Sequence, residues 1–387
     1  MLRKRPALFV LLFIAVAVAT GVALLQRSRG KGRQVDDAVV VVTVKPRRVL
    51  IETTETGQHV NFDFLLENRS DTQLKLTTVE LSVFDRRGAL ARRDFVNLFS
   101  RASVAMQDEK PIPPHGSILL FNPMPDFAAS VPLHRLEYVF SFTNEDYRGH
   151  AEAHARVLPE VYRTRTNLIL PLRGRVLVWD GHDLQSHHRR FDFTEARFRN
   201  RGNDSNYQRY GYDFVLVDER GSMHRGPAKV FDDWYRGPVD ANSDYLGFGA
   251  DVLAAGAGTV AAIHDGDPDN RRFDEAELEK RETAYGGNYI VLDHGNGEYS
   301  WFGHLQQGSI RVKRGDRVEQ GQTIARMGAS GDSLFPHLHY ELRNGAGARG
   351  VDGLPSEFTG FRRLLGTTVL PVERGTVTTG DIVQSQR

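Results

Sequence analysis

Short runs in which apolar and polar residues alternate follow one another in the first part of the chain after residue 38. The clearest runs cover 39–44, 61–66, 76–84, 117–121 and 136–142. Alternation with a period of two places the apolar side chains on one face of a strand, and the intervening "NRSD" and "DRRG" are turn-forming sequences. Several short strands without a convincing helix predict an immunoglobulin-like β-sandwich over 37–165, which we interpret as a binding or spacer module.

A second β-rich region runs from residue 167 to residue 366, where glycines separate the apolar runs. The sequence "DHGNG" at 293–297 is a strong signal for a β-hairpin turn. We therefore expect a mainly antiparallel β domain whose strand ends and loops line a groove. A short surface helix is expected at 274–282. Residues 367–387 lack an apolar pattern, so they are predicted to form a flexible tail.

The N-terminus differs from the rest because residues 7–25 contain no charged side chain. As a helix, this segment would be just long enough to cross a hydrocarbon core of about 30 Å. Residues 1–36 are therefore interpreted as a membrane anchor with a basic linker. A cleavable signal is the alternative, because Ala17-Val18-Ala19 is an acceptable cleavage site. Under either interpretation the rest of the chain is exported. The anchor predicts a single-pass inner-membrane protein with its C-terminal domains in the periplasm or another extracytoplasmic space.

Composition excludes several kinds of chemistry. The chain has 50 Lys and Arg residues against 49 Asp and Glu residues, a net charge of +1, which gives no reason to expect a nucleic-acid partner. Cysteine is absent, which excludes disulfides, thiolate metal sites and a cysteine nucleophile. The stretch "DGDPDN" at 265–270 begins like a calcium loop. Asn270 and Ala276 stand where such a loop needs glycine and glutamate, so calcium is not expected.

Three histidines and one aspartate are the candidate functional residues of the second region. In "SLFPHLHYELR", His337 and His339 are two positions apart and would project from the same face of a strand. His304 follows the predicted hairpin in "WFGHL", and Asp213 begins a strand in "RYGYD". Two explanations compete, namely a metal or catalytic site and ordinary packed polar residues. A pair of histidines alone does not decide between them.

Taken together, these motifs resemble the lysostaphin/LytM-type zinc endopeptidases that cut peptide cross-bridges in bacterial cell walls. The resemblance covers 247–343 and includes "GADVLAAGAGTVAAI", "GNYIVLDHGNGEYSWFGHL", "VKRGDRVEQGQTIARMGASG" and "FPHLHYELR". It implies an antiparallel β peptidase domain, a Zn²⁺ cofactor and a peptidoglycan peptide as substrate. It also implies that Asp213 and His339 are zinc ligands, and that His304 and His337 are catalytic.

The chain departs from the first motif of that family, HxxxD, because Arg209 stands four residues before Asp213. Arginine stays cationic and does not ligate zinc, and two protein ligands are too few for a catalytic site. The upstream "SHHRRFD" is similar to a stretch that precedes an RYGYD-type motif in a membrane-anchored branch of the family. We therefore predict that His188, or its neighbour His187, supplies the third ligand. The alternative for this stretch is an ordinary solvated basic loop.

Three classes of function follow from these residues. The leading prediction is an exported, membrane-tethered zinc endopeptidase that hydrolyses peptide bonds of peptidoglycan. The second is a catalytically degenerate protein of LytM fold that binds peptidoglycan or regulates other cell-wall hydrolases. Arg209 favours this second class, whereas the retention of His304, His337 and His339 disfavours it. The third is a purely structural envelope protein, and metal content separates the first class from the other two.

Overall fold

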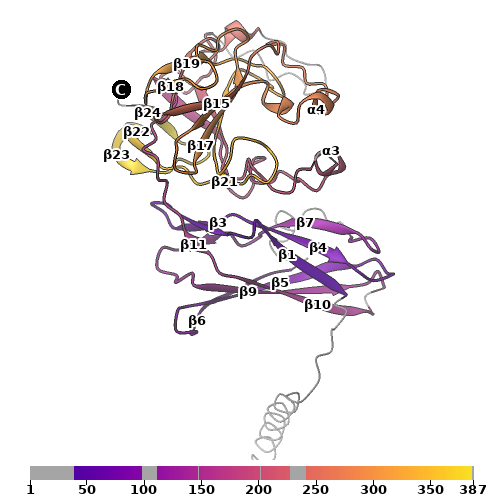
Figure 1. Cartoon of the computed structure of the whole chain (residues 1–387). Helices are drawn as coiled ribbons and strands as arrows, with labels where there is room; N and C mark the ends of the chain where they lie inside the picture. Colours follow the sequence, from indigo (N-terminus) through magenta and orange to yellow (C-terminus); the bar gives the residue numbers. More distant parts are fainter. Residues whose placement is uncertain (1–38, 98–110, 147, 201, 227–240, 386–387) are drawn as a thin grey trace, which may run out of the picture. The chain divides into compact units, whose positions relative to one another are not determined.

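The chain divides into two compact units, Met1–Ala38 and Val39–Arg387. The predicted boundary between the two β-rich regions falls inside the second unit, and the domain limits stay predictions. The computed structural model (Figure 1) describes residues 39–97, 111–146, 148–200, 202–226 and 241–385.

Three small sheets form the N-terminal part. Their strand orders are β1-β4-β7, β10-β9-β5-β6 and β11-β2-β3-β8, and the pairing is antiparallel except between β11 and β2. The strand bounds are β1 (Val40–Lys45), β2 (Leu50–Thr53), β3 (Gln58–Val60), β4 (Asp63–Asn68), β5 (Lys75–Phe84), β6 (Leu90–Asn97), β7 (Ser117–Phe121), β8 (Asp126–Phe127), β9 (Arg135–Thr143), β10 (His150–Val157) and β11 (Glu160–Val161).

Alternating side chains from two of these sheets share one apolar core. In β4, Phe64 and Leu66 are fully buried while Leu65 between them is only half-buried. The Phe64 ring meets the rings of Tyr138 and Phe140 in β9 edge-to-face, with centroids 4.8 Å apart in both cases. The sheets β1-β4-β7 and β10-β9-β5-β6 therefore face each other as a β-sandwich. Its immunoglobulin-like connectivity stays a prediction.

An 11-stranded sheet forms the centre of the C-terminal part. Its order is β18-β15-β16-β17-β20-β13-β12-β24-β22-β23, β21 pairs with β20, and β14-β19 is a separate two-stranded sheet. Its pairings are antiparallel, as predicted. The strand bounds are β12 (Arg175–Asp180), β13 (Tyr212–Leu216), β14 (Asp251–Leu253), β15 (Gly258–His264), β16 (Asn288–Asp293), β17 (Tyr299–Leu305), β18 (Arg317–Val318), β19 (Thr323–Arg326), β20 (Leu338–Arg343), β21 (Gly353–Leu354), β22 (Phe358–Leu365), β23 (Thr368–Gly375) and β24 (Ile382–Ser385).

The order of three neighbouring strands brings the candidate motifs together. The hairpin turn predicted from "DHGNG" joins β16 to β17, with Asp293 opposite Tyr299. β17 and β13 both flank β20, and the register places Gly303 and Asp213 opposite His339 from its two sides. The strand that carries His339 therefore lies between the strands that carry the other two motifs.

Helices are short in the described ranges. The helices are α3 (Ala196–Arg199), α4 (Glu277–Lys280) and the 3-10 turns η1 (Asn242–Asp244) and η2 (Ala284–Gly286). The predicted surface helix at 274–282 is present but shorter, because Arg281 is already extended, with φ −150° and ψ 114°.

The predicted membrane helix at 7–25 lies outside the described residues. Within the described ranges, no helix is long and apolar enough to cross a membrane. A crossing helix needs about 20 mostly apolar residues, whereas α3 and α4 have four residues each. On this finding, the fold class that included an N-terminal membrane helix is wrong, and so is the single-pass inner-membrane localisation. The mainly antiparallel β part of the predicted fold class is confirmed.

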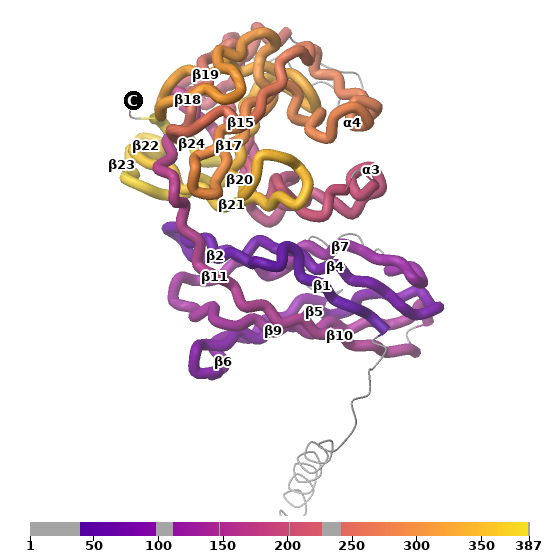
Figure 2. The backbone as a smooth tube through the Cα atoms, in the orientation of Figure 1, coloured from indigo at the N-terminus to yellow at the C-terminus, as the bar shows by residue number. Residues whose placement is uncertain are grey.

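A flexible tail was predicted over 367–387, but the described part of that range, up to residue 385, adds two strands to the large sheet (Figure 2). β24 lies between β12 and β22, and β23 forms the edge beyond β22. Val383 in β24 is fully buried, whereas Val369 and Leu370 in β23 are exposed. A short inserted strand and a largely exposed edge strand carry little alternation of apolar and polar residues. The hydrophobic pattern therefore gave no signal for them.

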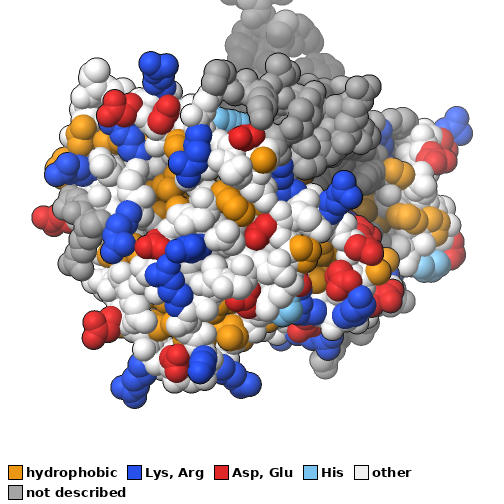
Figure 3. Space-filling model, turned by 90° about the horizontal axis from the view of Figure 1, so that it is seen from above, with side chains coloured by type: hydrophobic (Ala, Val, Ile, Leu, Met, Phe, Trp, Pro, Cys, Tyr) orange, Lys and Arg blue, Asp and Glu red, His pale blue; other side chains and the backbone are white. Residues whose placement is uncertain are grey.

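Charged side chains of both signs are interspersed on the face of the molecule seen in Figure 3. The described side chains visible there show Lys and Arg next to Asp and Glu rather than gathered by sign. This distribution agrees with the net charge of +1, because a strong attraction for polyanions needs a field of one sign.

Candidate metal centre

Three side chains from separate segments converge on one point. On the adjacent strands β13 and β20, Asp213 Oδ1 lies 3.0 Å from His339 Nδ1. From the segment after β12, His188 Nε2 lies 3.3 Å from the same carboxylate oxygen and 3.1 Å from His339 Nδ1. Two imidazole nitrogens and a carboxylate oxygen are a donor set that suits Zn²⁺. The structure thus brings together the three residues that the sequence suggested as ligands.

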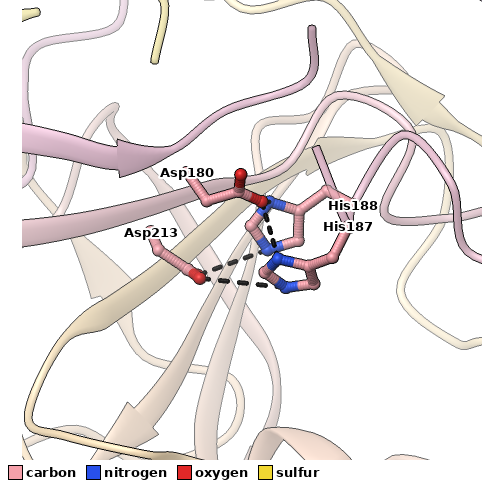
Figure 4. Close-up of side chains that lie close together, drawn as sticks. All are labelled: Asp180, His187, His188 and Asp213. Atoms are coloured by element: carbon pink, nitrogen blue, oxygen red, sulfur yellow. Dashed lines mark ion pairs between the residues drawn. The ribbon is translucent and has the colours of Figure 1, made fainter. Parts of the chain in front are cut away.

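His187 and Asp180 lie beside this point (Figure 4). Ligand atoms of Asp180, His187, His188 and Asp213 all lie within 4.8 Å of one another, so this group could hold a metal ion. His187 Nδ1 is 2.7 Å from Asp180 Oδ2, and His187 Nε2 is 3.8 Å from Asp213 Oδ2. The His187 side chain is 65% exposed, whereas that of His188 is fully buried. Of the two neighbours, His188 is therefore the better placed to face both Asp213 and His339.

Each converging imidazole is held from behind by a hydrogen-bond acceptor. His188 Nδ1 lies 3.0 Å from the carbonyl oxygen of Gly181 and 3.2 Å from Asp180 Oδ2. His339 Nε2 lies 2.5 Å from Glu341 Oε1. An N–H donated to these acceptors leaves the lone pairs of His188 Nε2 and His339 Nδ1 facing the centre. Metal ligation requires this tautomer, and acceptors of this kind fix it.

His337 and His304 line the same site, and each ring is held through Nδ1 by a backbone carbonyl, as that of His188 is. His337 Nδ1 is 2.8 Å from the carbonyl oxygen of Phe335, and its Nε2 is 3.4 Å from Asp213 Oδ1. His304 Nδ1 is 2.8 Å from the carbonyl oxygen of Ser330, and the two imidazole centroids are 4.6 Å apart. Because Nδ1 of each ring donates to a backbone carbonyl, Nε2 is the ring nitrogen that can accept or donate a proton in the site.

The backbone is unusual where His304 enters the site. Its φ is 54°, in the left-handed region that residues other than glycine rarely adopt. Gly303 precedes it, and a β-carbon at Gly303 would collide with the Trp301 ring. Backbone strain of this kind persists where the surrounding structure imposes it, and it is concentrated at functional sites. In the "GHL" motif, Gly303 is therefore needed because a side chain would collide with Trp301, and His304 is held with a strained backbone at the site.

The electrostatics of the centre favour a positive charge. Burial alone would raise the pKa of Asp213, but the neighbouring His188 and His337 outweigh it and hold that pKa well below its usual value. Burial alone would lower the pKa of His188, but Asp213 and Asp180 outweigh it and raise that pKa well above its usual value. Burial, reinforced by His337, keeps the pKa of His304 well below its ordinary value. A cation, whether a proton or a metal ion, is therefore stabilised between His188 and Asp213.

Arg209, which stands where the HxxxD motif would have its histidine, is engaged elsewhere. Its Nη2 lies 2.7 Å from Asp63 Oδ2 in β4, and both side chains are almost fully buried. None of its guanidinium nitrogens, Nε, Nη1 or Nη2, makes a hydrogen bond among the described residues, so its contact with Asp63 is an ion pair without a hydrogen bond. Arg209 therefore takes part in an interior ion pair with the β-sandwich, and it is not one of the three side chains that converge at the centre.

A pocket of about 590 Å³ opens onto the centre. Its lining includes Asp213, His304, His337, His339, Trp301 and Phe335. Charged and polar side chains make up most of the lining, and aromatic side chains stand beside them. Convergent polar groups next to apolar walls can hold a ligand in one orientation.

Comparisons with known proteins agree with this architecture. A family model described as Peptidase family M23 matches residues 245–352. The peptidoglycan DD-endopeptidase ShyA of Vibrio cholerae is 40% identical over 85 residues, which are 22% of this chain and 19% of ShyA. ShyB of the same organism is 38% identical over 85 residues, which are 22% of this chain and 20% of ShyB. The murein hydrolase activator EnvC of Escherichia coli is 39% identical over 57 residues, which are 15% of this chain and 13% of EnvC.

The C-terminal part therefore contains a peptidase M23 domain of the LytM/lysostaphin family, as the resemblance predicted. The matches span about a fifth or less of the length of these curated relatives. Among solved structures, the catalytic domain of lysostaphin from Staphylococcus simulans is 25% identical, covers 30% of this chain and 81% of that chain, and has a TM-score of 0.21. His304, His337 and His339 lie within the residues that the family model matches, whereas His188 and Asp213 precede them.

Two residues of the site were not singled out from the sequence. Glu341, which accepts from His339, lies two positions beyond it on the same strand, so the alternation that linked His337 to His339 also extends to Glu341. Asp180, which approaches both His187 and His188, ends β12 and has no comparable signal. Asp180 meets the two histidines only because the segment after β12 folds back and brings His187 and His188 next to it.

Proposed function

We propose that this protein is a zinc endopeptidase that hydrolyses peptide bonds of peptidoglycan. The convergence of His188 Nε2, Asp213 Oδ1 and His339 Nδ1 carries the proposal. In this assignment these three atoms hold Zn²⁺, and His188 supplies the ligand that Arg209 does not. When bound, the ion would act as a Lewis acid and would lower the pKa of a water molecule bound to it.

His304 and His337 are assigned to proton transfer and to stabilisation of the developing charge. Nε2 of His304 is a neutral acceptor, because its Nδ1–H donates to Ser330 and burial lowers its pKa. It would accept the proton of the attacking water. Burial alone would lower the pKa of His337, but Asp213 outweighs it and raises that pKa. The Nε2–H of His337 would therefore donate to the oxyanion formed at the peptide carbonyl.

The substrate class is proposed from the relatives and from the pocket. ShyA and ShyB are both named as peptidoglycan DD-endopeptidases. The pocket over the centre has aromatic walls at Trp301 and Phe335, against which a peptide could lie beside the two histidines.

Zinc content and cell-wall digestion test this proposal. Protein from residue 37 onward should hold about one zinc per chain and release soluble peptides from purified peptidoglycan. His339→Ala should lose most of the zinc and the activity. His154→Ala, which changes an exposed histidine in β10, is the matched control and should retain both. A folded wild-type protein that takes up no zinc on reconstitution would contradict the proposal.

A regulatory role is the second candidate. The specific observations that favour it are the similarity to EnvC, which is named as a murein hydrolase activator, and Arg209 in place of the first motif's histidine. The clustering of His188, His304, His337 and His339 argues against a site that has lost its chemistry. A zinc-loaded wild-type protein that cleaves no peptidoglycan but stimulates another cell-wall hydrolase would favour the regulatory role.

A further inference from the structure

The segment that carries His188 is held by the β-sandwich at both of its ends. At one end, His182 Nε2 lies 2.9 Å from Glu52 Oε2 in β2, and both side chains are buried. At the other end, Arg189 Nη1 donates to Asp63 Oδ1 in β4 at 2.6 Å, and both side chains are fully buried. His188 is the immediate neighbour of Arg189, so its backbone is fixed next to a buried ion pair.

Asn61 connects the two ends of this segment. Its Nδ2 donates to the carbonyl oxygen of His182 at 3.4 Å, and its Oδ1 accepts from Arg189 Nε at 3.2 Å. Arg189 Nη2 donates in addition to the carbonyl oxygen of Phe62 at 2.7 Å. Three consecutive sandwich residues, 61–63, therefore bind the same guanidinium group. A planar guanidinium with several fixed acceptors has little freedom to shift.

Asp63 also reaches the segment that leads to the second ligand. Its Oδ2 lies 2.7 Å from Arg209 Nη2, and Arg209 stands four residues before Asp213. One buried carboxylate thus pairs with two buried guanidinium groups, one beside His188 and one just ahead of Asp213. Asp63 itself lies in the middle strand of the sheet β1-β4-β7. Displacement of either segment would leave a buried charge unpaired, which is strongly unfavourable.

We propose that the β-sandwich is a structural part of the metal centre, and that Asp63, Asn61 and Glu52 are positioning residues for His188 and Asp213. This inference rests on the zinc site proposed above. It also gives Arg209 a role. Where the family motif has a ligand, this chain has an anchor for the sandwich, and the missing ligand comes from a segment that the sandwich holds. Metal–ligand distances stay within about 0.2 Å of their usual values, so loss of the anchoring contacts should lower the metal affinity by a measurable amount.

The competing explanation is that these contacts only dock the sandwich against the peptidase domain. Both explanations predict that the variants are less stable. They differ in what happens to the centre of a protein that is still folded. Simple docking predicts unchanged metal affinity, whereas positioning predicts weaker metal binding and altered ligand geometry.

The experiment uses Asp63→Asn and Asn61→Ala in the protein from residue 37 onward, with Glu298→Gln as the matched control. Glu298 is likewise a fully buried carboxylate, but it accepts from the backbone of Arg165 and Thr166 and not from the segment that carries His188. Zinc affinity is measured by competition with a chelator, well below the unfolding temperature of each variant. The absorption spectrum of the Co²⁺-loaded protein reports the ligand geometry.

We expect Asp63→Asn to bind zinc about 10–100-fold more weakly, the range found when outer partners of metal ligands are lost. Asn61→Ala should weaken binding in the same direction, and both variants should change the Co²⁺ spectrum, while Glu298→Gln should match the wild type. If Asp63→Asn does not fold, Asn61→Ala decides the question. Variants with wild-type affinity and spectrum would overturn the inference and leave the proposed function intact. A wild-type protein that binds neither Zn²⁺ nor Co²⁺ would overturn both.

Discussion

At the scale of single residues, two neighbouring histidines differ far more in structure than in sequence. The sequence predicts His188 as the ligand in "SHHRRFD", with His187 as the alternative, but adjacent imidazoles in a basic stretch give no sign of which one is buried. The structure separates them, since the His188 side chain is fully buried beside Asp213 and that of His187 is 65% exposed. Both approach Asp180 through Nδ1, so Asp180 orients the pair.

The first prediction therefore compares His188→Ala with His187→Ala. Loss of a direct ligand should weaken zinc binding by more than the roughly 10–100-fold that follows loss of an outer partner. His188→Ala should accordingly be zinc-free at micromolar zinc, and His187→Ala should stay loaded. Zinc titration of the two purified variants measures this, with circular dichroism as a check that both remain folded. Full zinc loading of His188→Ala would remove that residue from the ligand set.

The motifs on regular strands were predictable from sequence, and the residues that join segments were not. Alternation along one strand predicted that His337 and His339 share a face. His339 lies in β20, His337 immediately precedes that strand, and both side chains line the pocket. The pairing of Arg209 with Asp63 joins residues 146 positions apart, and neither residue carries a local signal for it. Interactions between residues so far apart in the sequence depend on how the two β-rich parts pack against each other. A hydrophobic pattern does not encode that packing.

At the scale of elements, the connection that leads out of the sandwich is held by one buried carboxylate. Glu298, in the turn that joins β16 to β17, accepts from the backbone N–H of Arg165 and Thr166 and from the hydroxyl groups of Tyr162 and Thr166. Burial alone would raise the pKa of Glu298, but these hydrogen bonds outweigh it and lower the pKa below its usual value. The turn predicted as an ordinary hairpin thus also anchors the linker.

The second prediction concerns pH. Because the pKa of Glu298 is lower in the folded protein, its contribution to stability is present above the usual glutamate pKa of about 4.3 and is lost as the pH falls through the folded value. Glu298→Gln should lower the free energy of unfolding by about 2 kcal/mol at pH 7, since hydrogen bonds to a charged group are replaced. The difference from wild type should shrink below pH 4. Chemical denaturation at pH 7 and pH 3.5 tests this, and the exposed Glu80→Gln serves as control.

The third prediction concerns β24, which the hydrophobic pattern did not indicate. Val383 is fully buried between β12 and β22, so Val383→Ala should cost about 2 kcal/mol through two lost buried methyl groups and the space they leave. Val369→Ala on the exposed edge strand β23 should change stability by less than about 0.5 kcal/mol. Equal thermal unfolding of the two variants would mean that the C-terminal strands contribute little to the folded sheet.

At the scale of the whole molecule, the two β-rich parts share cores as well as ion pairs. Leu50 of the sandwich and Tyr162 of the linker belong to the main apolar cluster of the peptidase part. Leu119 and Phe121 of β7 pack with Phe193, which follows the segment that carries His188. Apolar contact and buried charge therefore coincide at the same junction. A spacer that only separated the peptidase domain from another structure would need neither.

The last prediction is that the peptidase part does not function as an independent fragment. A fragment from residue 166 onward lacks Asp63 and Glu52, so the guanidinium groups of Arg189 and Arg209 lose their partner carboxylate. The fragment also loses the apolar contacts that Leu50, Leu119 and Phe121 make with the peptidase part, so apolar surface is exposed and the segment that carries His188 has nothing to hold it. Expressed alone, the fragment should be poorly folded and should bind zinc weakly. Co-expressed with residues 39–165, it should copurify with them and recover zinc binding, whereas a sandwich fragment with Asp63→Asn should restore less. A fragment from residue 166 that folds alone and binds zinc as tightly as the longer protein would contradict this prediction.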